Sequence, residues 1–513
     1  MKFLSTLFFL CTLGSGFSAA NKQPNILLIL ADDLGYGDVA CYNPESKVPT
    51  PVLDQMASDG IRFTDAHSPA TVCTPTRYSV MTGRMAFRTG RGNVFSGVGG
   101  PSLIEKDRLT LPAILRAKGY HTACFGKWHI GLTFHDKDGN IITERGNKGV
   151  KLIDYDRPIP DAPIHQGFDK FYGTACCPTT DWLYAYIDGD RIPVPPTQIL
   201  DKSTIPDHFY ALDCRPGLIA PNFDLEEVDM VFLRKSQEFL DSHFEETPEK
   251  PFFLFHSCQA VHLPSFPAKQ FQGKTEAGPH GDFIHQLDWT VGELLASLEK
   301  HGATENTLVI FASDNGPEVP SIYDMRRTYQ HDGARPWRGV KRDQWEGGHR
   351  TPFIIKWPAI TKEGQTCEEL ISLTDIFATC ADIVSASYPE DAAEDSVTFL
   401  PILNGTLGET THREFMIQQT NFRKLSIRND NWKYIDHKGS GGNNYQKPGP
   451  GSMGDYAIKE QAPDAPGQLY DLSVDPGETN NLYFVKPEKA AFLKEKLDGF
   501  TKNGRSAPIR PKD

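Results

Sequence analysis

Basic residues are scarce in this sequence. It has 53 lysines and arginines against 66 aspartates and glutamates, a formal net charge of −13. A general nucleic-acid-binding protein needs a basic surface to contact phosphates, so this class is excluded. The electrostatic field of this net negative charge also repels anions, so an anionic substrate would need a local cluster of positive side chains.

Long hydrophobic runs are also scarce. No segment is apolar over a length that would cross a bilayer, which predicts no stable membrane insertion. The N-terminus has the pattern of an export signal, with Lys2, an apolar run over residues 3–13, and small residues at Ser18-Ala19-Ala20. We therefore expect residues 1–20 to be a signal peptide that is cleaved and the mature protein to be exported, periplasmic or secreted.

The ten cysteines lack the paired Cys-x-x-Cys units of a zinc site. In an exported protein some of them could form disulfides, and a chain of this size could equally keep them as buried thiols. Internal repeats are absent as well, and the length of 513 residues predicts two domains.

Four continuous apolar runs each lead into a polar motif. Such a run, without polar alternation, is typical of a strand buried on both faces of a parallel sheet. The runs cover residues 24–31, 120–125, 252–255 and 307–312. Residues 111–118 and 283–299 are amphipathic, end near glycines, and are predicted helices.

This alternation predicts an α/β fold, with a large, mostly parallel sheet sandwiched by helices. Ligands of such sheets bind outside the carboxyl ends of the strands. Because the polar motifs all follow strands, we expect several of them to converge at one edge.

The composition changes near residue 390. Short segments at 424–428, 432–435 and 468–472 predict antiparallel strands, and residues 487–500 predict a final helix. Residues 439–454 are rich in Gly, Ser and Asn and predict a loop. We expect a large domain over residues 21–390 and a smaller C-terminal α+β subdomain, built on an antiparallel sheet, over residues 391–513.

The stretch Cys73-Thr74-Pro75-Thr76-Arg77 places a cysteine at the junction of a loop and a helix. Pro75 suits the first helical position, and Arg77, four residues after Cys73, would approach the sulfur. The free N–H groups of a helix start attract anions. For an isolated pair, a buried cysteine beside a surface arginine would be the default interpretation.

Two acidic pairs follow predicted strands: Asp32-Asp33 and Asp314-Asn315. Neighbouring carboxylates repel one another, and their burial is costly without a counter-charge such as a divalent cation. An all-oxygen set favours a hard cation, calcium rather than magnesium because irregular geometry suits calcium better. Either pair alone could be a surface turn; both together favour metal binding.

Lys127 and His129 alternate with Trp128, so both can point the same way from an extended segment. A lysine can hold an anion, and a histidine can transfer protons near neutral pH. Alone, such a triplet would be interpreted as a solvated surface pair.

Two further basic candidates lie later in the chain. His262 follows the strand at residues 252–255, and its competitor His256 is interpreted as a core residue. Lys341 lies in residues 335–350, which carry five lysines and arginines. This segment is either a solvated loop or a positive patch for an anionic substrate.

Together these motifs resemble those of the type I sulfatases of the alkaline phosphatase superfamily. Their signature is Cys-x-Pro-x-Arg followed by Thr-Gly-Arg, here Thr82-Gly83-Arg84, and Gly126-Lys127-Trp128-His129 resembles the second signature. Met81 departs from the more usual leucine. The likeness spans nearly the whole chain after residue 20 and is greatest to the arylsulfatase A and N-acetylgalactosamine-6-sulfatase branch.

The resemblance implies that residues 21–390 form a sulfatase catalytic domain of alkaline-phosphatase-like fold. A maturation enzyme, formylglycine-generating or anaerobic, would oxidise Cys73 to formylglycine, whose hydrate is the nucleophile. One calcium ion per chain would be held by Asp32, Asp33, Asp314, Asn315 and position 73. The implied catalytic residues are Cys73, Arg77, Lys127, His129, His262 and Lys341.

The expected activity is hydrolysis of sulfate esters on a polysaccharide or oligosaccharide. One alternative is a phosphonate or phosphodiester hydrolase of the same superfamily, and another is an inactive secreted glycan-binding protein. Where many sulfatases place a polar group near the sulfate, this chain has Thr174-Ala175-Cys176-Cys177, to which no role is assigned. Four side chains are candidates for a sugar subsite or for packing: Trp182, Tyr184, Trp345 and His349.

Overall fold

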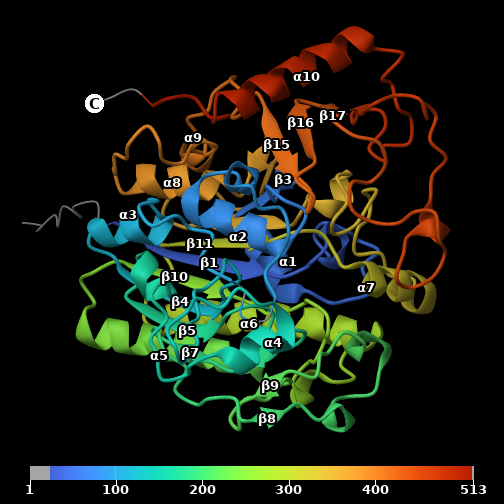
Figure 1. The fold of residues 1–513 in the computed structure, drawn as a ribbon. Coiled ribbons are helices and arrows are strands. Elements are labelled where there is room, and N and C mark those ends of the chain that lie inside the picture. The colour runs from blue at the N-terminus through green and yellow to red at the C-terminus, as the bar shows by residue number, and fades with distance from the viewer. Residues whose placement is uncertain (1–22, 97, 99, 511–513) are drawn as a thin grey trace, which may run out of the picture.

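The computed structural model describes residues 23–96, 98 and 100–510 (Figure 1). The predicted signal peptide, residues 1–20, lies outside this part of the chain. Among the described residues, none of the helices combines the length and the apolar character that crossing a membrane requires.

A nine-stranded sheet forms the centre of the molecule (Figure 1). Its five central strands run parallel, and the edges add antiparallel pairs. In order across the sheet the strands are β13 (Gln365–Cys367), β2 (Ile61–Phe63), β12 (Phe353–Lys356), β11 (Thr307–Ser313), β1 (Asn25–Ala31), β10 (Phe252–Ser257), β4 (His121–Lys127), β5 (Lys170–Thr174) and β7 (Ile187–Asp188). The predicted mostly parallel sheet is confirmed.

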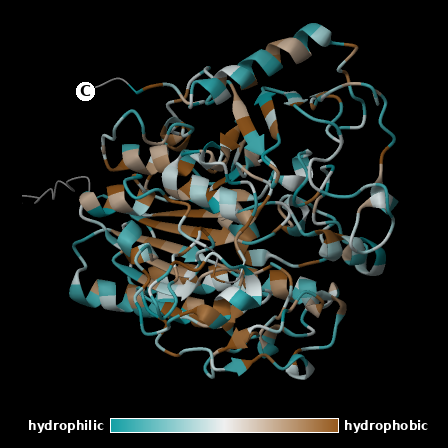
Figure 2. Cartoon of the chain, viewed as in Figure 1, coloured by the Kyte–Doolittle hydropathy of each residue, from teal (hydrophilic) through white to brown (hydrophobic). Residues whose placement is uncertain are grey.

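Helices cover both faces of this sheet, which explains why β1 is apolar at every position from Ile26 to Ala31. Ile26 and Leu28 pack into the core on one face, whereas Leu27 and Ile29 pack into the core on the other. The central strands are accordingly the most hydrophobic part of Figure 2. One face carries α2 (Cys73–Thr82), α3 (Leu111–Ala117) and α8 (Asp375–Ile383), and the other carries α1 (Pro51–Ser58), α5 (Val228–Glu246) and α6 (Gly278–Lys300).

The C-terminal part contains a separate antiparallel sheet of four strands, as expected. These are β15 (Met416–Gln419), β16 (Leu425–Asn429), β17 (Trp432–Ile435) and β18 (Gln468–Asp471). Helix α10 (Pro487–Lys502) covers this sheet, with Leu493 and Leu497 packed against Ile427 and Leu469 (Figure 1). The division into residues 21–390 and 391–513 stays a prediction.

Short elements complete the fold. They are α4 (Gly146–Leu152), α7 (Val319–Asp324), α9 (Leu400–Leu403), the strand pair β3 (Ala66–His67) and β14 (Ile371–Ser372), and the three strands β6 (Leu183–Tyr184), β9 (Leu218–Ile219) and β8 (Gln198–Ile199).

Two sequence-based details differ from the structure. Helix α2 begins at Cys73, so Pro75 is its third residue rather than its first. Helix α6 begins at Gly278, several residues before the predicted start, because Pro279 can occupy the first helical turn. No disulfide joins the nine cysteines among the described residues.

A buried ionic network joins the C-terminal sheet to the segment that carries Lys341. Lys433, on β17, donates to Glu346 at 2.9 Å and forms an ion pair with Glu478 at 2.9 Å, and Arg428 on β16 donates to Glu346 at 3.0 Å. The side chains of Lys433, Glu346 and Glu478 are fully shielded from solvent. Removing one partner of such a network leaves a buried charge without compensation.

We predict that Lys433→Met lowers the free energy of unfolding by about 3–5 kcal/mol, because Glu346 and Glu478 lose their shared cation. Chemical denaturation measures this change. The matched control is Lys494→Met, which removes an exposed lysine that pairs with Asp498 on α10 and should cost less than about 1 kcal/mol. Equal losses in the two variants would contradict the prediction.

Candidate active site

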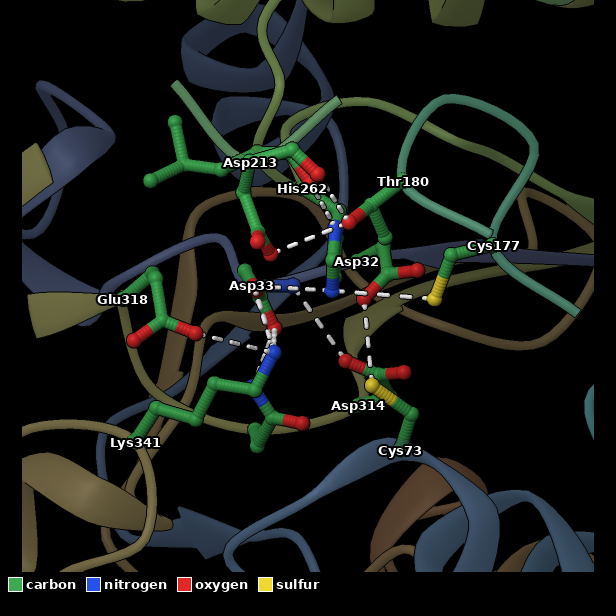
Figure 3. Close-up of polar contacts among 12 residues, drawn as sticks. Asp32, Asp33, Cys73, Cys177, Thr180, Asp213, His262, Asp314, Glu318 and Lys341 are labelled. Atoms are coloured by element: carbon green, nitrogen blue, oxygen red, sulfur yellow. Dashed lines mark hydrogen bonds and ion pairs between the residues drawn. The ribbon is translucent and has the colours of Figure 1, made fainter. Parts of the chain in front are cut away.

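Cys73 is the first residue of α2 and is buried. Val72 before it is extended, so the chain turns into the helix at the cysteine itself. The Cys73 Sγ lies 3.5 Å from Oδ1 of Asp32, at the carboxyl end of β1 (Figure 3). The predicted nucleophile position therefore faces the predicted acidic cluster.

The two acidic pairs meet because β1 and β11 are neighbouring parallel strands. The Asp33 backbone N–H donates to Asp314 Oδ1 at 3.2 Å, and Asn315 Nδ2 donates to Asp33 Oδ1 at 2.7 Å. Asp33 has a φ of 62°, a left-handed conformation that is uncommon for aspartate and frequent at functional sites. The Asn315 Oδ1 is buried and has no hydrogen-bond partner.

Arg77, one helical turn after Cys73, extends beneath this cluster. Its guanidinium donates to Asp314 Oδ2 at 2.9 Å and to the Lys127 carbonyl at 3.1 Å, and it lies 3.4 Å from Asp32. It does not lie on the surface; it is 1 % exposed. Burial alone would lower its pKa, but Asp314 and Asp32 raise it above the ordinary arginine value.

Two lysines complete the ionic cluster. Lys127, the last residue of β4, donates to Asp32, and Lys341 donates to both oxygens of Asp33 at 2.6 and 2.7 Å. Gly126 allows β4 to lie close to neighbouring β10, because a Cβ at this position would lie 1.8 Å from the Ser257 carbonyl oxygen. Burial opposes the charge of each lysine, but the carboxylates raise both pKa values.

His129 is a neutral base by its surroundings. Its Nε2 lies 2.9 Å from the Phe95 carbonyl, which can only accept, so Nε2 carries the proton and Nδ1 has the free lone pair. Burial and the charge of Lys127 lower its pKa to about 3. The ring is therefore uncharged at neutral pH, with its single proton on Nε2.

The surroundings of His262 raise its pKa, whereas those of His129 lower it. Its Nδ1 faces the Leu263 carbonyl, and its Nε2 lies 3.7 Å from Asp33 Oδ2 (Figure 3). Burial alone would lower its pKa, but Cys177 and the two aspartates raise it above the ordinary value. His256, by contrast, is bonded to Ser236 in the core, as expected.

Cys177, which sequence reasoning left without a role, lies between the two site histidines. Its Sγ is 3.7 Å from His129 Nδ1 and 3.6 Å from His262 Nε2. Burial would raise its pKa, but His262 and Lys127 lower it below that of an ordinary thiol. The available signal was its position just after β5, which pairs with β4 and so ends at the same edge.

With Cys177 included, the structure joins all predicted site residues in one cluster of polar contacts. It contains Cys73, Arg77, Lys127, His129, His262, Lys341, Asp32, Asp33, Asp314 and Asn315. The roles assigned to these residues stay predictions. Glu318 was missed: it lies 3.5 Å from Lys341 and pairs with Arg342.

The basic segment over residues 335–350 is not an open positive patch. Arg335 pairs with Glu45, Arg342 with Glu318, and Arg350 with Asp65. Arg338 lies over the ring of Trp345. Lys341 alone reaches the site cluster, so most of the segment's charge is neutralised within the protein.

Three of the four candidate sugar-binding side chains are packing residues. Tyr184, Trp345 and His349 are at most 3 % exposed. Trp182 is partly buried and lies beneath Arg215. Of the four, only Trp182 has exposed surface that could contact a sugar.

Among the residues that the structure describes, two groups of side chains have the spacing of metal ligands. Ligand atoms of Asp32, Asp33, Cys73 and His262 lie within 4.8 Å of one another. The second group, His67, Glu346 and His349, is already bonded to Lys433. Of these two groups, the first contains the predicted nucleophile position, Cys73.

The fold and this site define a hydrolase of anionic esters, and comparison with known proteins gives the family. The sulfatase family profile matches residues 24–386. The chain is 33% identical over 506 residues to an N-acetylgalactosamine-6-O-sulfatase of Bacteroides thetaiotaomicron, covering 93% of each protein. It is 30% identical to human arylsulfatase A, covering 98% of this chain and 94% of that protein.

Comparison with solved structures supports this assignment. A Bacteroides thetaiotaomicron structure from work on the metabolism of multiple glycosaminoglycans superposes with a TM-score of 0.75 at 29% identity, covering 94% of this chain and all of that one. A sulfatase from Pseudoalteromonas sp. gives 0.69 at 24% identity, covering 95% and 92%, and supports the fold alone. The chain belongs to the sulfatase family and is a sulfuric ester hydrolase.

We predict that the Cys177 thiol ionises at lower pH than an ordinary thiol, because His262 and Lys127 stabilise its thiolate. The ultraviolet absorbance of thiolate, titrated as the difference between the parent protein and Cys177→Ser, measures this. His262→Gln should raise the midpoint. The control Cys367→Ser removes a thiol whose pKa is about 11 and should give no difference at neutral pH. A Cys177 midpoint at or above the ordinary value would contradict the prediction.

Proposed function

We propose that this sulfatase removes sulfate from a sulfated carbohydrate, a polysaccharide or an oligosaccharide, using formylglycine at position 73 and one calcium ion. The observation that carries this proposal is the contact between Cys73 and the acidic cluster. It sets an oxidisable side chain, at a helix start, against a group of buried carboxylates that is suited to a cation.

The charge of the site supports an anionic substrate. Asp32, Asp33 and Asp314 contribute three negative charges, and three positive charges come from Arg77, Lys127 and Lys341. A divalent cation would give this balanced cluster a net positive charge. A sulfate ester is then attracted locally, although the whole protein has a charge of −13.

The oxygen atoms of the cluster fit a hard cation. Asn315 Oδ1 is buried without a partner, as expected of a ligand atom. The pKa of Asp314 is raised to about 6 by burial and by Asp32, a destabilisation that a cation would relieve. Asp32, Asp33, Asp314 and Asn315 would hold calcium, which when bound polarises the oxygens of the sulfate group.

Cys73 would supply the nucleophile after oxidation by a maturation enzyme. Formylglycine at this position supplies, as its hydrate, one hydroxyl to attack sulfur and a second that later allows sulfate to leave. Arg77 fixes the position of Asp314 and contributes positive charge beneath residue 73. Lys127 and Lys341 stay protonated and can each donate to an oxygen of the sulfate group.

The two histidines are suited to opposite proton transfers. His262 has a raised pKa, so its Nε2 can donate a proton to the departing alcohol oxygen. This favours His262 over Lys341 as the general acid, because Lys341 is bound to both oxygens of Asp33. His129 keeps Nδ1 unprotonated and can take the proton from the hydroxyl that remains at position 73.

The substrate class is proposed from the relatives. One is named for the 6-O-sulfate of N-acetylgalactosamine, and a solved relative comes from work on glycosaminoglycan metabolism. We extend a carbohydrate substrate to this chain, together with export after cleavage of residues 1–20.

We predict that the peptide containing position 73 has the mass of an aldehyde in place of a thiol, in protein from a host that matures sulfatases. Mass spectrometry measures this, and hydrolysis of an aryl sulfate and of sulfated oligosaccharides should accompany it. The controls are Cys73→Ala and a known sulfatase from the same host. An intact cysteine beside a matured control would exclude the mechanism.

We predict that calcium raises the thermal unfolding temperature of the unmatured protein, because it compensates the three buried carboxylates. A chelator should reverse the shift, and magnesium should give a smaller one. In Asn315→Ala, which lacks the unpartnered Oδ1, the calcium Kd should rise about tenfold or more. Asn140→Ala, an exposed amide, is the control. Equal calcium shifts in both variants would remove Asn315 from the ligand set.

A further inference from the structure

A cavity of about 610 Å³ adjoins the active site. Its walls come from three distant parts of the chain: the segment after α2, the residue before α4, and the turn between β15 and β16. A cavity of this size is typical of a small-molecule or sugar site. Three arginines line it: Arg91, Arg145 and Arg423.

These arginines have uncompensated charge. The described residues that line the cavity include no aspartate or glutamate, although these outnumber lysine and arginine in the chain. Within the described residues, none of the three has a carboxylate at ion-pair distance. By contrast, Arg84 and Arg88, a few residues earlier, pair with Glu394 and Asp395. Burial and the charge of Arg145 lower the pKa of Arg91, as expected without an anion nearby.

Phe95 connects the cavity to the active site. Its ring lies 3.9 Å from the Arg91 guanidinium carbon and forms part of the cavity wall. Its carbonyl bonds to His129 Nε2 at 2.9 Å, and its N–H bonds at 3.2 Å to Thr74, the neighbour of Cys73. Phe95 thus lines the cavity and also contacts the proposed base, His129, and the neighbour of the proposed nucleophile, Thr74.

The other lining groups suit a carbohydrate. Phe422 is 58 % exposed, so its ring is available to a sugar in the cavity. Asn93 and Asn421 offer amides that can both donate and accept hydrogen bonds. A sugar unit with a negatively charged group would engage the ring, the amides and the arginines together.

We propose that this cavity is a subsite for the sugar unit next to the one that carries the cleaved sulfate, and that Arg145 and Arg423 bind an anionic group on that unit. The anion is a uronate carboxylate or a second sulfate ester. This inference rests on the proposed carbohydrate substrate. It also identifies a local positive cluster of the kind that an acidic sulfatase needs, since three of the four arginines of residues 335–350 are paired with carboxylates and the fourth, Arg338, lies over Trp345.

Arg145 and Arg423 are the residues to change, because both are exposed, whereas Arg91 packs on Phe95 and so supports His129. In a Cys73→Ala background, which cannot turn over, calorimetry measures binding of a sulfated oligosaccharide whose neighbouring unit is a uronate. A matched ligand has that carboxylate reduced to an alcohol. We expect the carboxylate to tighten binding about tenfold or more.

The double variant Arg145→Ala/Arg423→Ala should lose this discrimination, so that both ligands bind equally. The control Arg191→Ala removes an arginine that is also exposed but lies outside the cavity, and it should keep the tenfold ratio. Thermal unfolding confirms that each variant is folded. The discrimination should also weaken as salt concentration rises.

A third ligand carries a sulfate ester on the neighbouring unit in place of the carboxylate. Loss of discrimination with either anion supports the subsite and identifies the anion. Unchanged discrimination in the double variant with both anions would overturn it. Because binding is measured without turnover, this outcome is independent of the proposed reaction, which fails separately if matured enzyme hydrolyses no sulfate ester.

Discussion

The burial of three carboxylates at one edge of a sheet is the constraint on which the site depends. Asp32, Asp33 and Asp314 would repel one another strongly in this low-polarity environment without compensation. The chain compensates them with three cations from three separate elements, α2, β4 and the segment before β12. The same arrangement also leaves the buried Oδ1 of Asn315 without a hydrogen-bond partner.

The parallel sheet makes this convergence possible. β1, β10, β4 and β11 are distant in sequence, but their carboxyl ends lie at one edge, so the residues that follow them meet without long connecting loops. Left-handed residues at Asp33 and His129 then turn the chain sharply after two of these strands. Strand order therefore determines which residues meet, and local backbone geometry determines how their side chains are aimed.

Much of this arrangement could be predicted from sequence, since an unbroken apolar run and the polar residues after it are both local signals. The partners of those residues are not local. Arg342 and Arg350 looked like free charge in the sequence, but Glu318 and Asp65 neutralise them in the fold. Cys177 carries no pattern of its own, and only the pairing of β5 with β4 brings it between two histidines.

This acidic protein has two kinds of positive charge, one paired with carboxylates and one unpaired. The positive charges of the site cluster are buried and paired with carboxylates, so by themselves they leave little net charge to attract a substrate over a long range. Long-range attraction of an anion requires charge that the protein leaves unpaired, and within the described part of the chain Arg91, Arg145 and Arg423 line a cavity without a carboxylate at ion-pair distance. Because Arg145 and Arg423 lie on loops and not on the sheet, they can vary without disturbing the site cluster, which is how one fold accommodates many sulfated substrates.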